Sequence, residues 1–282
     1  MFGSNKIVSR LDEMLTDAIN GRFSETSYDE TELSRLEGKF RQYLTGKETA
    51  AEKIQAERAA IKELVTDISH QTKTPIANIS LYTQLLAEIS PPELMPYVEQ
   101  IRLQSEKLEF LIQSLTKISR LESDMIVLHP KPQEVSLLLE AAVREVKGQA
   151  DAKQTTVLVK MEEGAVANYD MRWTTEALGN LLDNAVKYSP EKSTVTVCVD
   201  IMEMFICIRV EDEGPGIPEE EMAQVFERFY RGKNAARADG NGVGLYLARM
   251  IVCKERGYMK VSARAGSGSC FRMYLPRYIQ RR

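Results

Sequence analysis

The sequence predicts an α + α/β fold, in which an antiparallel helical hairpin that dimerises into a four-helix bundle is followed by an α/β sandwich. Apolar residues recur with a seven-residue period over 33–71 and 94–118, as in long paired helices. The segment "MIVLHPKPQE" at 125–134 carries two prolines and ends this helical half. Beyond it, short strand-like runs alternate with helical patterns, which is typical of a sheet covered by helices.

The composition limits the classes of protein to consider. With 282 residues, 43% of them hydrophobic and 28% charged, the chain has room for about two soluble domains. A net charge of −4 provides no basic field, so we expect no nucleic-acid partner. No apolar run approaches the ~18 residues of a membrane span, and "MFGSNKIVSR" lacks the core of a signal peptide, so we expect the chain as given to be cytoplasmic.

Cysteine usage agrees with a reducing compartment. The cysteines show no Cys-x-x-Cys spacing and have no histidine nearby in sequence, so we expect buried free thiols rather than a disulfide or a metal site. They are Cys198, Cys207, Cys253 and Cys270.

The helical half is predicted to comprise a hairpin domain at residues 53–124, preceded by a connector and a helix at 1–52. Its first register contains Leu33, Phe40, Lys47, Ile54, Ile61 and Ile68, and its second Leu94, Ile101, Leu108 and Leu115. The proline-containing turn "SPPELMPY" joins the two helices. One hairpin cannot bury both of its apolar seams, whereas two copies in a four-helix bundle can, so we expect a homodimer.

Residues 125–282 are predicted to form the α/β sandwich, with helices on one face of the sheet. We expect helices at 135–148, 171–187 and 243–256, a short helix near 219–227, and strands at 155–161, 193–201, 204–211, 258–264 and 269–275. A polar, glycine-containing segment at 231–242 interrupts this alternation.

The predicted helix that contains "TEALGNLLDNAVKYSP" carries polar side chains suited to a magnesium triphosphate. Asn180 and Asn184 are four residues apart, so both carboxamides project from one side, and Lys187 lies one turn beyond. An amide oxygen suits the hard cation and the lysine suits the phosphates. Taken alone, this set also fits a solvated polar face.

The stretch "EDEGPGIPEE" follows directly on a predicted strand. Asp212 at the strand end can accept a hydrogen bond from an exocyclic amine such as adenine N6, and Gly214 and Gly216 would let the backbone approach the ring. A turn with a capping acid explains the same residues equally well.

A third stretch, "ADGNGVGLYLARM", places Gly240, Gly242 and Gly244 at the mouth of a helix, where backbone amides favour phosphate. The spacing is not that of a dinucleotide fingerprint, and no Gly-Lys-Ser/Thr loop occurs. By themselves, Gly266 and Gly268 before the last strand need only form a hairpin turn.

In their order and separation, these motifs resemble the nucleotide-binding boxes of sensor histidine kinases, which belong to the ATPase superfamily that includes gyrase B, Hsp90 and MutL. "NLLDNAVKYSP" resembles the N box, "DEGPGIP" the G1 box, "FERFYRG" the F box and "GNGVGL" the G2 box, with a G3 box after them. "SHQTKTPI", on the first helix of the hairpin, resembles the H box. The resemblance spans about residues 55–276 and leaves the first fifty or so outside.

This resemblance implies ATP and Mg²⁺ as cofactors and a set of binding residues. These are Asn180, Asn184, Lys187, Tyr188, Asp212, Gly214, Gly216, Arg228, Arg231, Gly240, Gly242, Gly244 and Leu245. Asn184 would be the magnesium ligand, with Asn180 its neighbour, and Asp212 would bind adenine N6. Either Arg228 or Arg231 would reach the γ-phosphate.

The same resemblance gives Lys187 a phosphate contact, packs Tyr188 on adenine and makes residues 231–242 a mobile lid. In the gyrase, Hsp90 and MutL branches a glutamate one turn before the magnesium asparagine is the base for water. Asn180 occupies that position here and is not a base at neutral pH. The sequence therefore favours phosphoryl transfer to a side chain over hydrolysis.

His70 is the phosphoacceptor that the H box implies. It lies two residues after the heptad core position Ile68, so it faces outward, and its imidazole is largely neutral at cytoplasmic pH. Without the H box a surface histidine would be the ordinary interpretation, and His129 in the linker keeps that structural interpretation.

Two further positions beside His70 bear on catalysis. The family usually has Glu or Asp after the histidine, whereas Gln71 cannot be a general base, although it could hold the ring tautomer or position a water. Thr74, four residues after His70, matches the family residue associated with orienting water for dephosphorylation of the regulator. Pro75 lacks an amide and would bend the helix below His70, which predicts a hinge.

The resemblance implies a dimeric kinase core that phosphorylates His70 from Mg-ATP. The phosphoryl group would pass to an aspartate of a response-regulator receiver domain, and the chain would also have phosphatase activity toward that partner. The N-terminal heptads would transmit a signal from an upstream sensor, which in family members often lies in the membrane. Gln71 motivates one alternative, an ATP-binding scaffold or a member acting chiefly as phosphatase. A serine kinase of the anti-sigma type is another, disfavoured because that type lacks an H-box hairpin.

Overall fold

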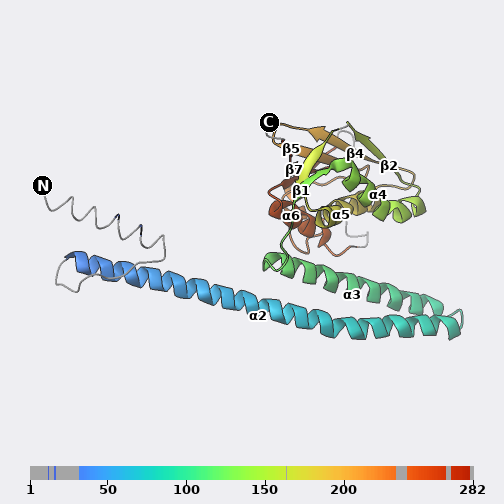
Figure 1. Ribbon diagram of the computed structural model, residues 1–282. Coiled ribbons are helices and arrows are strands. Elements are labelled where there is room, and N and C mark those ends of the chain that lie inside the picture. Colours follow the sequence, from blue (N-terminus) through green and yellow to red (C-terminus); the bar gives the residue numbers. More distant parts are fainter. Residues whose placement is uncertain are drawn as a thin grey trace. The chain divides into compact units, whose positions relative to one another are not determined.

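The computed structural model describes residues 12, 16, 32–162, 164–232, 240–264 and 268–279 (Figure 1). The chain divides into two compact units, Met1–Leu64 and Val65–Arg282. Most of the connector predicted before Leu33 lies outside the described residues, as does the central part of the predicted lid, residues 233–239.

Two long helices form the predicted hairpin. Helix α2 (Glu32–Ile89) runs through Pro75 without ending, and α3 (Met95–Glu122) begins with a proline in its first turn. Helix α2 ends with a hydrogen bond from the amide of Ser90 to the carbonyl of Leu86 at 2.8 Å, and the turn is closed by one from the amide of Leu94 to the carbonyl of Pro91 at 3.0 Å.

The apolar stripe of the hairpin faces solvent in the single chain. Tyr82, Ile89 and Tyr97 are 63%, 78% and 69% exposed, and Ile101 and Leu108 are also exposed. Apolar side chains repeated at this spacing on neighbouring helices are typical of a surface that a partner covers.

The predicted strands are confirmed to within a few residues. They form one five-stranded sheet in the order β2 (Thr156–Met161), β4 (Thr194–Ile201), β5 (Phe205–Glu211), β7 (Ser269–Pro276) and β6 (Tyr258–Ala263). Strand β2 pairs with β4 in parallel, and the other neighbours are antiparallel.

A separate two-stranded sheet was not predicted. It pairs β1 (Lys131–Glu134) with β3 (Val166–Tyr169) in antiparallel fashion. Strand β1 has the sequence KPQE, whose proline and polar residues are typical of a linker, and its partner lies more than thirty residues further along.

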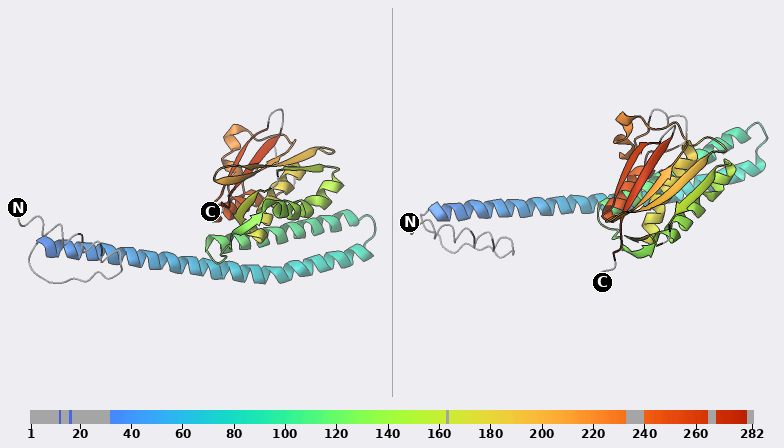
Figure 2. Two further views of the ribbon diagram at one scale, coloured as in Figure 1. Left: turned by 45° about the horizontal axis from the view of Figure 1, so that its top comes forward. Right: turned by 90° about the horizontal axis from the view of Figure 1, so that it is seen from above.

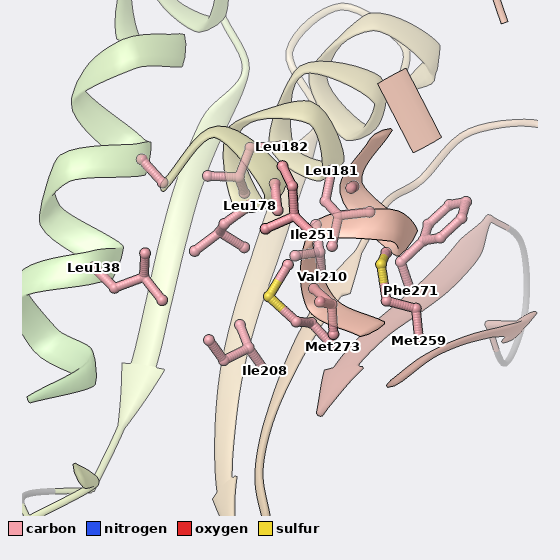
Figure 3. Packing of buried hydrophobic residues seen from close by; sticks show 14 of the residues in the cluster. Leu138, Leu178, Leu181, Leu182, Ile208, Val210, Ile251, Met259, Phe271 and Met273 are labelled. Carbon is pink, nitrogen blue, oxygen red and sulfur yellow. The ribbon is translucent and has the colours of Figure 1, made fainter. Parts of the chain in front are cut away.

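Three helices cover one face of the five-stranded sheet: α4 (Val135–Ala152), α5 (Met171–Tyr188) and α6 (Gly244–Lys254) (Figures 1 and 2). Leu178, Leu181 and Leu182 of α5 are fully buried against sheet residues that include Ile208 and Met273 (Figure 3). Burial of such side chains contributes roughly 2 kcal/mol each, which holds α5 on the sheet.

The end of α3 joins this core. Ile118 and Leu121 are fully buried in the same apolar cluster. Lys117 of α3 forms an ion pair with Glu176 of α5 at 2.5 Å, so apolar and charged contacts both connect the last turns of α3 to the sandwich.

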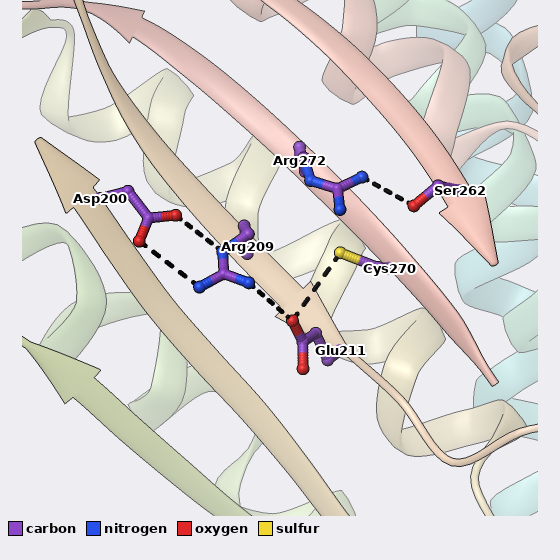
Figure 4. A network of polar contacts seen from close by, with 6 residues as sticks. All are labelled: Asp200, Arg209, Glu211, Ser262, Cys270 and Arg272. Atoms are coloured by element: carbon purple, nitrogen blue, oxygen red, sulfur yellow. Dashed lines mark hydrogen bonds and ion pairs between the residues drawn. The ribbon is translucent and has the colours of Figure 1, made fainter. Parts of the chain in front are cut away.

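The other face of the sheet carries polar side chains. Arg209 of β5 pairs with Asp200 of β4 at 2.7 Å and with Glu211 at 3.0 Å, and Arg272 of β7 donates to Ser262 of β6 at 2.7 Å (Figure 4). This alternation of apolar and polar faces is expected of a sheet with helices on one side.

All four cysteines are free thiols. Cys207 and Cys270 are buried, as predicted, and burial raises the pKa of both thiols. Cys198 is only half-buried and Cys253 is exposed, so the prediction of burial was wrong at these two positions; Cys253 is not among the buried residues of α6.

Two 3₁₀ turns, η1 (Glu219–Glu221) and η2 (Gln224–Phe226), replace the single short helix predicted near 219–227. None of the helices in the described parts of the chain has an apolar stretch of the length and composition needed to cross a bilayer.

Candidate active site

A cavity of about 190 Å³ lies in the sandwich beside the last turns of α5 and the start of α6. Most of the binding residues predicted from the sequence line it. They are Asn180, Asn184, Lys187, Tyr188, Asp212, Gly216, Arg231, Gly240, Gly242, Gly244 and Leu245. Gly214 and Arg228 are not among its lining residues.

Helix α5 presents the two asparagines. Its start is capped by the side chain of Asp170, which accepts hydrogen bonds from two backbone amides of the first turn. The Asn180 side-chain amide donates to the carbonyl of Glu176 at 2.8 Å, and a Cβ atom placed on Gly244 would lie 2.5 Å from its Oδ1. The side chain of Asn180 therefore lies close against the start of α6, while Asn184 lines the cavity one turn further on.

Lys187 lies at the end of the same helix. Its Nζ atom is 5.3 Å from the centre of the Tyr188 ring, and a Cβ atom on Gly240 would lie 2.6 Å from it. Lys153 of α4 donates to the carbonyl oxygens of Val186 and Lys187 at 3.0 and 2.6 Å, which satisfies this helix end. The ammonium group is thus held next to the glycine-rich segment.

Asp212, which lines the same cavity, is 4% exposed. Its Oδ1 atom accepts hydrogen bonds from the amides of Gly214 at 2.8 Å and Ser269 at 3.1 Å. Burial raises the pKa of this carboxyl, while the two amides and the charge of Arg264 oppose the rise. A carboxylate fixed in this way at the edge of an apolar cavity is suited to an amine donor.

Gly268 explains how Asp212 is held. Its φ is +104°, and a Cβ atom there would lie 2.0 Å from the carbonyl oxygen of Asp212. The sequence indicated only a hairpin turn at this glycine, whereas the structure uses it for the close approach of two strands. Gly266 lies outside the described residues.

The glycine-rich segment is tied to the F box by backbone contacts. Phe229 donates its amide to the carbonyl of Gly242 at 2.8 Å, and Gly242 has a φ of +64° with no room for a Cβ atom beside Phe229. Helix α6 begins directly afterwards at Gly244 and lines the cavity with its first residues. Amides at the start of a helix favour a phosphate.

The two candidate arginines lie in different surroundings. Arg231 lines the cavity and its charge acts on Tyr188. The Arg228 guanidinium lies over the rings of Phe229 and Tyr246, at 5.5 and 6.0 Å, and Tyr246 donates to Glu122 of α3 at 2.7 Å. The geometry therefore favours Arg231 over Arg228 as the phosphate contact.

The H-box residues all lie on α2 and do not line the cavity. The side chains of Gln71 and Thr74 are exposed, as is that of Pro75. His70 is within the helix, but its side chain lies outside the described residues. His129 is exposed in the linker, where its amide donates to Asp170 at 3.0 Å.

Several lining residues escaped the sequence analysis. They include Phe110, Asp183, Ile217, Glu221, Val225, Tyr230, Asn241, Ser269 and Phe271. Ile217 and Tyr230 belong to the quoted G1 and F boxes, Val225 directly precedes the F box and Phe271 lies in the last strand, so alternation of buried positions could have indicated them. Glu221 follows two other glutamates, a pattern typical of a solvated turn, and Phe110 is distant in sequence.

The residues present fit a magnesium nucleotide. In the described part of the chain, no three or more histidine, cysteine or acidic side chains gather to hold a metal by themselves. A magnesium ion held mainly by phosphates needs only one or two protein ligands, and the Asn184 carboxamide in the cavity is a suitable one.

Comparison with known proteins agrees with this arrangement. Residues 60–124 match the His Kinase A (phospho-acceptor) domain, and residues 169–279 match the histidine kinase-, DNA gyrase B- and HSP90-like ATPase family. Sensor protein SrrB of Staphylococcus aureus is 28% identical over 222 residues, which are 77% of this chain and 38% of SrrB. The chain thus spans less than half of that relative's length.

Solved structures share the fold at lower identity. ShkA, determined in complex with AMPPNP, has a TM-score of 0.64 and 23% identity over 78% of this chain and 47% of its own. ThkA, determined with the response regulator protein TrrA, has a TM-score of 0.59 and 20% identity, and the match covers 83% of this chain and 67% of ThkA. AdeS of Acinetobacter baumannii has a TM-score of 0.55 and 22% identity, and the match covers 74% of this chain and 98% of the AdeS structure.

The two matched domains follow one another in the chain as hairpin and sandwich, and the ATPase match contains the cavity walls formed by α5, β5 and α6. The first is a histidine kinase phospho-acceptor domain, and the second is an ATPase domain that histidine kinases share with DNA gyrase B and HSP90. The chain therefore belongs to the sensor histidine kinase family.

Proposed function

We propose that the chain binds Mg-ATP in the cavity, phosphorylates His70, passes the phosphoryl group to an aspartate of a response-regulator receiver domain and also removes it from that partner. The observation that carries the proposal is the polarity of the cavity. A buried carboxylate, Asp212, lines the cavity together with the cations Lys187 and Arg231 and the glycine-rich start of α6.

This polarity matches the two ends of ATP. Asp212 would accept from adenine N6 between apolar side chains such as Ile217 and Val225. Lys187, Arg231 and the amides before Gly244 would contact the phosphates. Asn184 would hold the magnesium ion, which neutralises phosphate charge when bound.

In the transfer step, a neutral ring nitrogen of His70 would attack the γ-phosphorus as the bond to the β-phosphate oxygen breaks, and ADP would leave. The imidazole proton must then go to a base. The exposed Gln71 amide cannot take it, so Gln71 is proposed to hold the ring tautomer or a water that does. Thr74, exposed one turn later, is proposed to orient water for dephosphorylation of the partner.

The exposed apolar stripe of α2 and α3 supports a homodimer with a four-helix bundle. The fold likeness to ThkA, which was determined with a response regulator protein, supports a receiver domain as the partner of this chain.

Gln71 also favours a second candidate, an ATP-binding scaffold or a chiefly phosphatase member. Such a chain would bind Mg-ATP in the same cavity but would acquire little or no label at His70. The two candidates therefore differ in a single measurable step, the phosphorylation of the histidine.

Incubation with γ-labelled ATP and magnesium tests the proposal. The wild-type chain should acquire acid-labile, base-stable label, and a receiver domain should then remove it. His70→Gln should abolish the label, and the matched control His129→Gln should retain it because that histidine is exposed in the linker.

Label that persists in His70→Gln would overturn the assignment of the phosphoacceptor. Nucleotide binding without label in the wild-type chain, together with label in Gln71→Glu, would favour the scaffold, since that change restores the acid usual after the histidine.

A further inference from the structure

Glu221 is a buried acid in the wall of the cavity to which neither the sequence motifs nor the proposed function gives a role. It ends the 3₁₀ turn η1 and is 4% exposed, whereas its neighbours Glu219 and Glu220 are exposed. Its Oε1 atom has no hydrogen-bond partner. Few other buried polar side-chain atoms in the described part of the chain lack a partner. A buried carboxylate oxygen that lacks a donor is costly, so it calls for a ligand.

Glu221 is fixed at its backbone, and other residues surround its carboxylate. The amide of Glu221 donates to the carbonyl of Pro218 at 2.9 Å, and burial together with the charge of the Glu221 carboxylate raises the pKa of the Tyr230 phenol. A Cβ atom placed on Gly232 would lie 2.5 Å from Oε2, so backbone crowds that oxygen. Tyr230 and Gly232 line the same cavity, so Oε1 is the oxygen left for a ligand bound there.

The donors of the bound molecule decide what Oε1 can accept. The phosphates of an adenine nucleotide carry acceptors only, and its donors are the exocyclic amine and the two ribose hydroxyls. Asp212 lies in the same cavity and is the proposed acceptor for the amine. A second buried carboxylate in that cavity therefore matches the ribose hydroxyls.

We propose that Glu221 accepts a hydrogen bond from a ribose hydroxyl and makes this site select ribonucleotides over deoxyribonucleotides. The inference rests on the proposed ATP binding and adds a specificity-determining residue to it. A site built to accept a hydroxyl rejects a ligand that lacks it, because the buried acceptor is then left unpaired.

Calorimetric titration of the full chain with ADP, 2′-deoxy-ADP and 3′-deoxy-ADP in the presence of magnesium tests this inference without any variant. A hydrogen bond to a buried carboxylate predicts that at least one deoxy ligand binds about tenfold more weakly than ADP. Equal affinity for the three ligands overturns the inference while leaving ATP binding intact. Failure of the wild-type chain to bind any of them overturns the proposed function and this inference with it.

Variants assign the discrimination to its residue. Glu221→Gln keeps the shape with an uncharged acceptor and should reduce the ratio of affinities, and Glu221→Met should bring the ratio close to one. Glu220→Gln, one residue away and exposed, should leave the ratio as in the wild type, and Asp212→Asn should weaken all three ligands equally. Discrimination that survives in Glu221→Met, or an equal loss for all ligands in both Glu221 variants, contradicts a ribose contact.

Discussion

We predict that Glu255→Gln removes a pH dependence from the stability of the ATP-binding domain. Glu255 follows the last turn of α6 and is 2% exposed. It accepts hydrogen bonds from the amide of Asp170 at 2.7 Å and from the hydroxyl of Thr174 at 2.8 and 2.9 Å. Burial raises its pKa from 4.5 to about 7, the Asp170 charge adds to the rise, and both hydrogen bonds oppose it.

The sign of the effect follows from linkage. Because folding raises this pKa, the protonated carboxyl favours the folded state fully below pH 4.5, and the contribution is lost as pH rises through about 7. At about 1.4 kcal/mol per pKa unit, the change corresponds to about 3 kcal/mol in the free energy of unfolding. Most of this loss falls between about pH 5 and 8. Glutamine is neutral throughout and keeps an acceptor for the same donors.

Urea unfolding at pH 5 and at pH 8, followed by tryptophan fluorescence, measures the effect. Trp173 is the only tryptophan and is 8% exposed on α5, so its signal reports on this domain. The stability of Glu255→Gln relative to wild type should rise by about 2–3 kcal/mol from pH 5 to pH 8. Comparison at each pH cancels the titration of all other groups.

Glu140→Gln is the matched control, because Glu140 is an exposed carboxylate of the same domain, on α4. Its stability relative to wild type should not change with pH. If the Glu255 variant and wild type lose stability in parallel between these pH values, the reasoning from burial is refuted.

Three further changes test the site and the phosphoacceptor helix. Asn184→Ala should abolish Mg-ATP binding measured by calorimetry, and unchanged affinity with magnesium present would contradict its role as ligand. Gly244→Ala places a Cβ atom 2.5 Å from Oδ1 of Asn180. We therefore expect weaker nucleotide binding and a loss of about 1–3 kcal/mol in the free energy of unfolding. Wild-type values for both measurements would show that the Asn180 side chain moves aside freely. Pro75→Ala restores an amide within α2 and should straighten the helix and change the ratio of kinase to phosphatase activity, an expectation that unaltered activities would rule out.

Local patterns made much of the fold predictable. The heptads of α2 and α3 and the short apolar strands are periodic within a few residues, and that period depends only on backbone geometry. The four-residue spacing of Asn180 and Asn184 likewise places both on one side of α5 wherever the helix packs.

Features made by distant segments could not be read in this way. The pairing of β1 with β3 depends on register between segments far apart, and the short polar β1 carries no apolar signal. The choice between Arg228 and Arg231 depends on which side of the F-box turn faces the cavity and which meets Tyr246. Spacing in the sequence is the same for either outcome.

The sequence by itself determined the helical hairpin, the sheet with helices on one face and the motifs proposed to bind nucleotide, because these follow from short-range periodicity and residue type. Only the tertiary structure decided that Gly268 packs on Asp212, that Cys253 is exposed and that Glu221 is buried with an unpaired oxygen in the cavity wall. The physical reason is that burial and close approach are properties of packing between segments. A run of three glutamates reads as solvated until the fold places one of them inside.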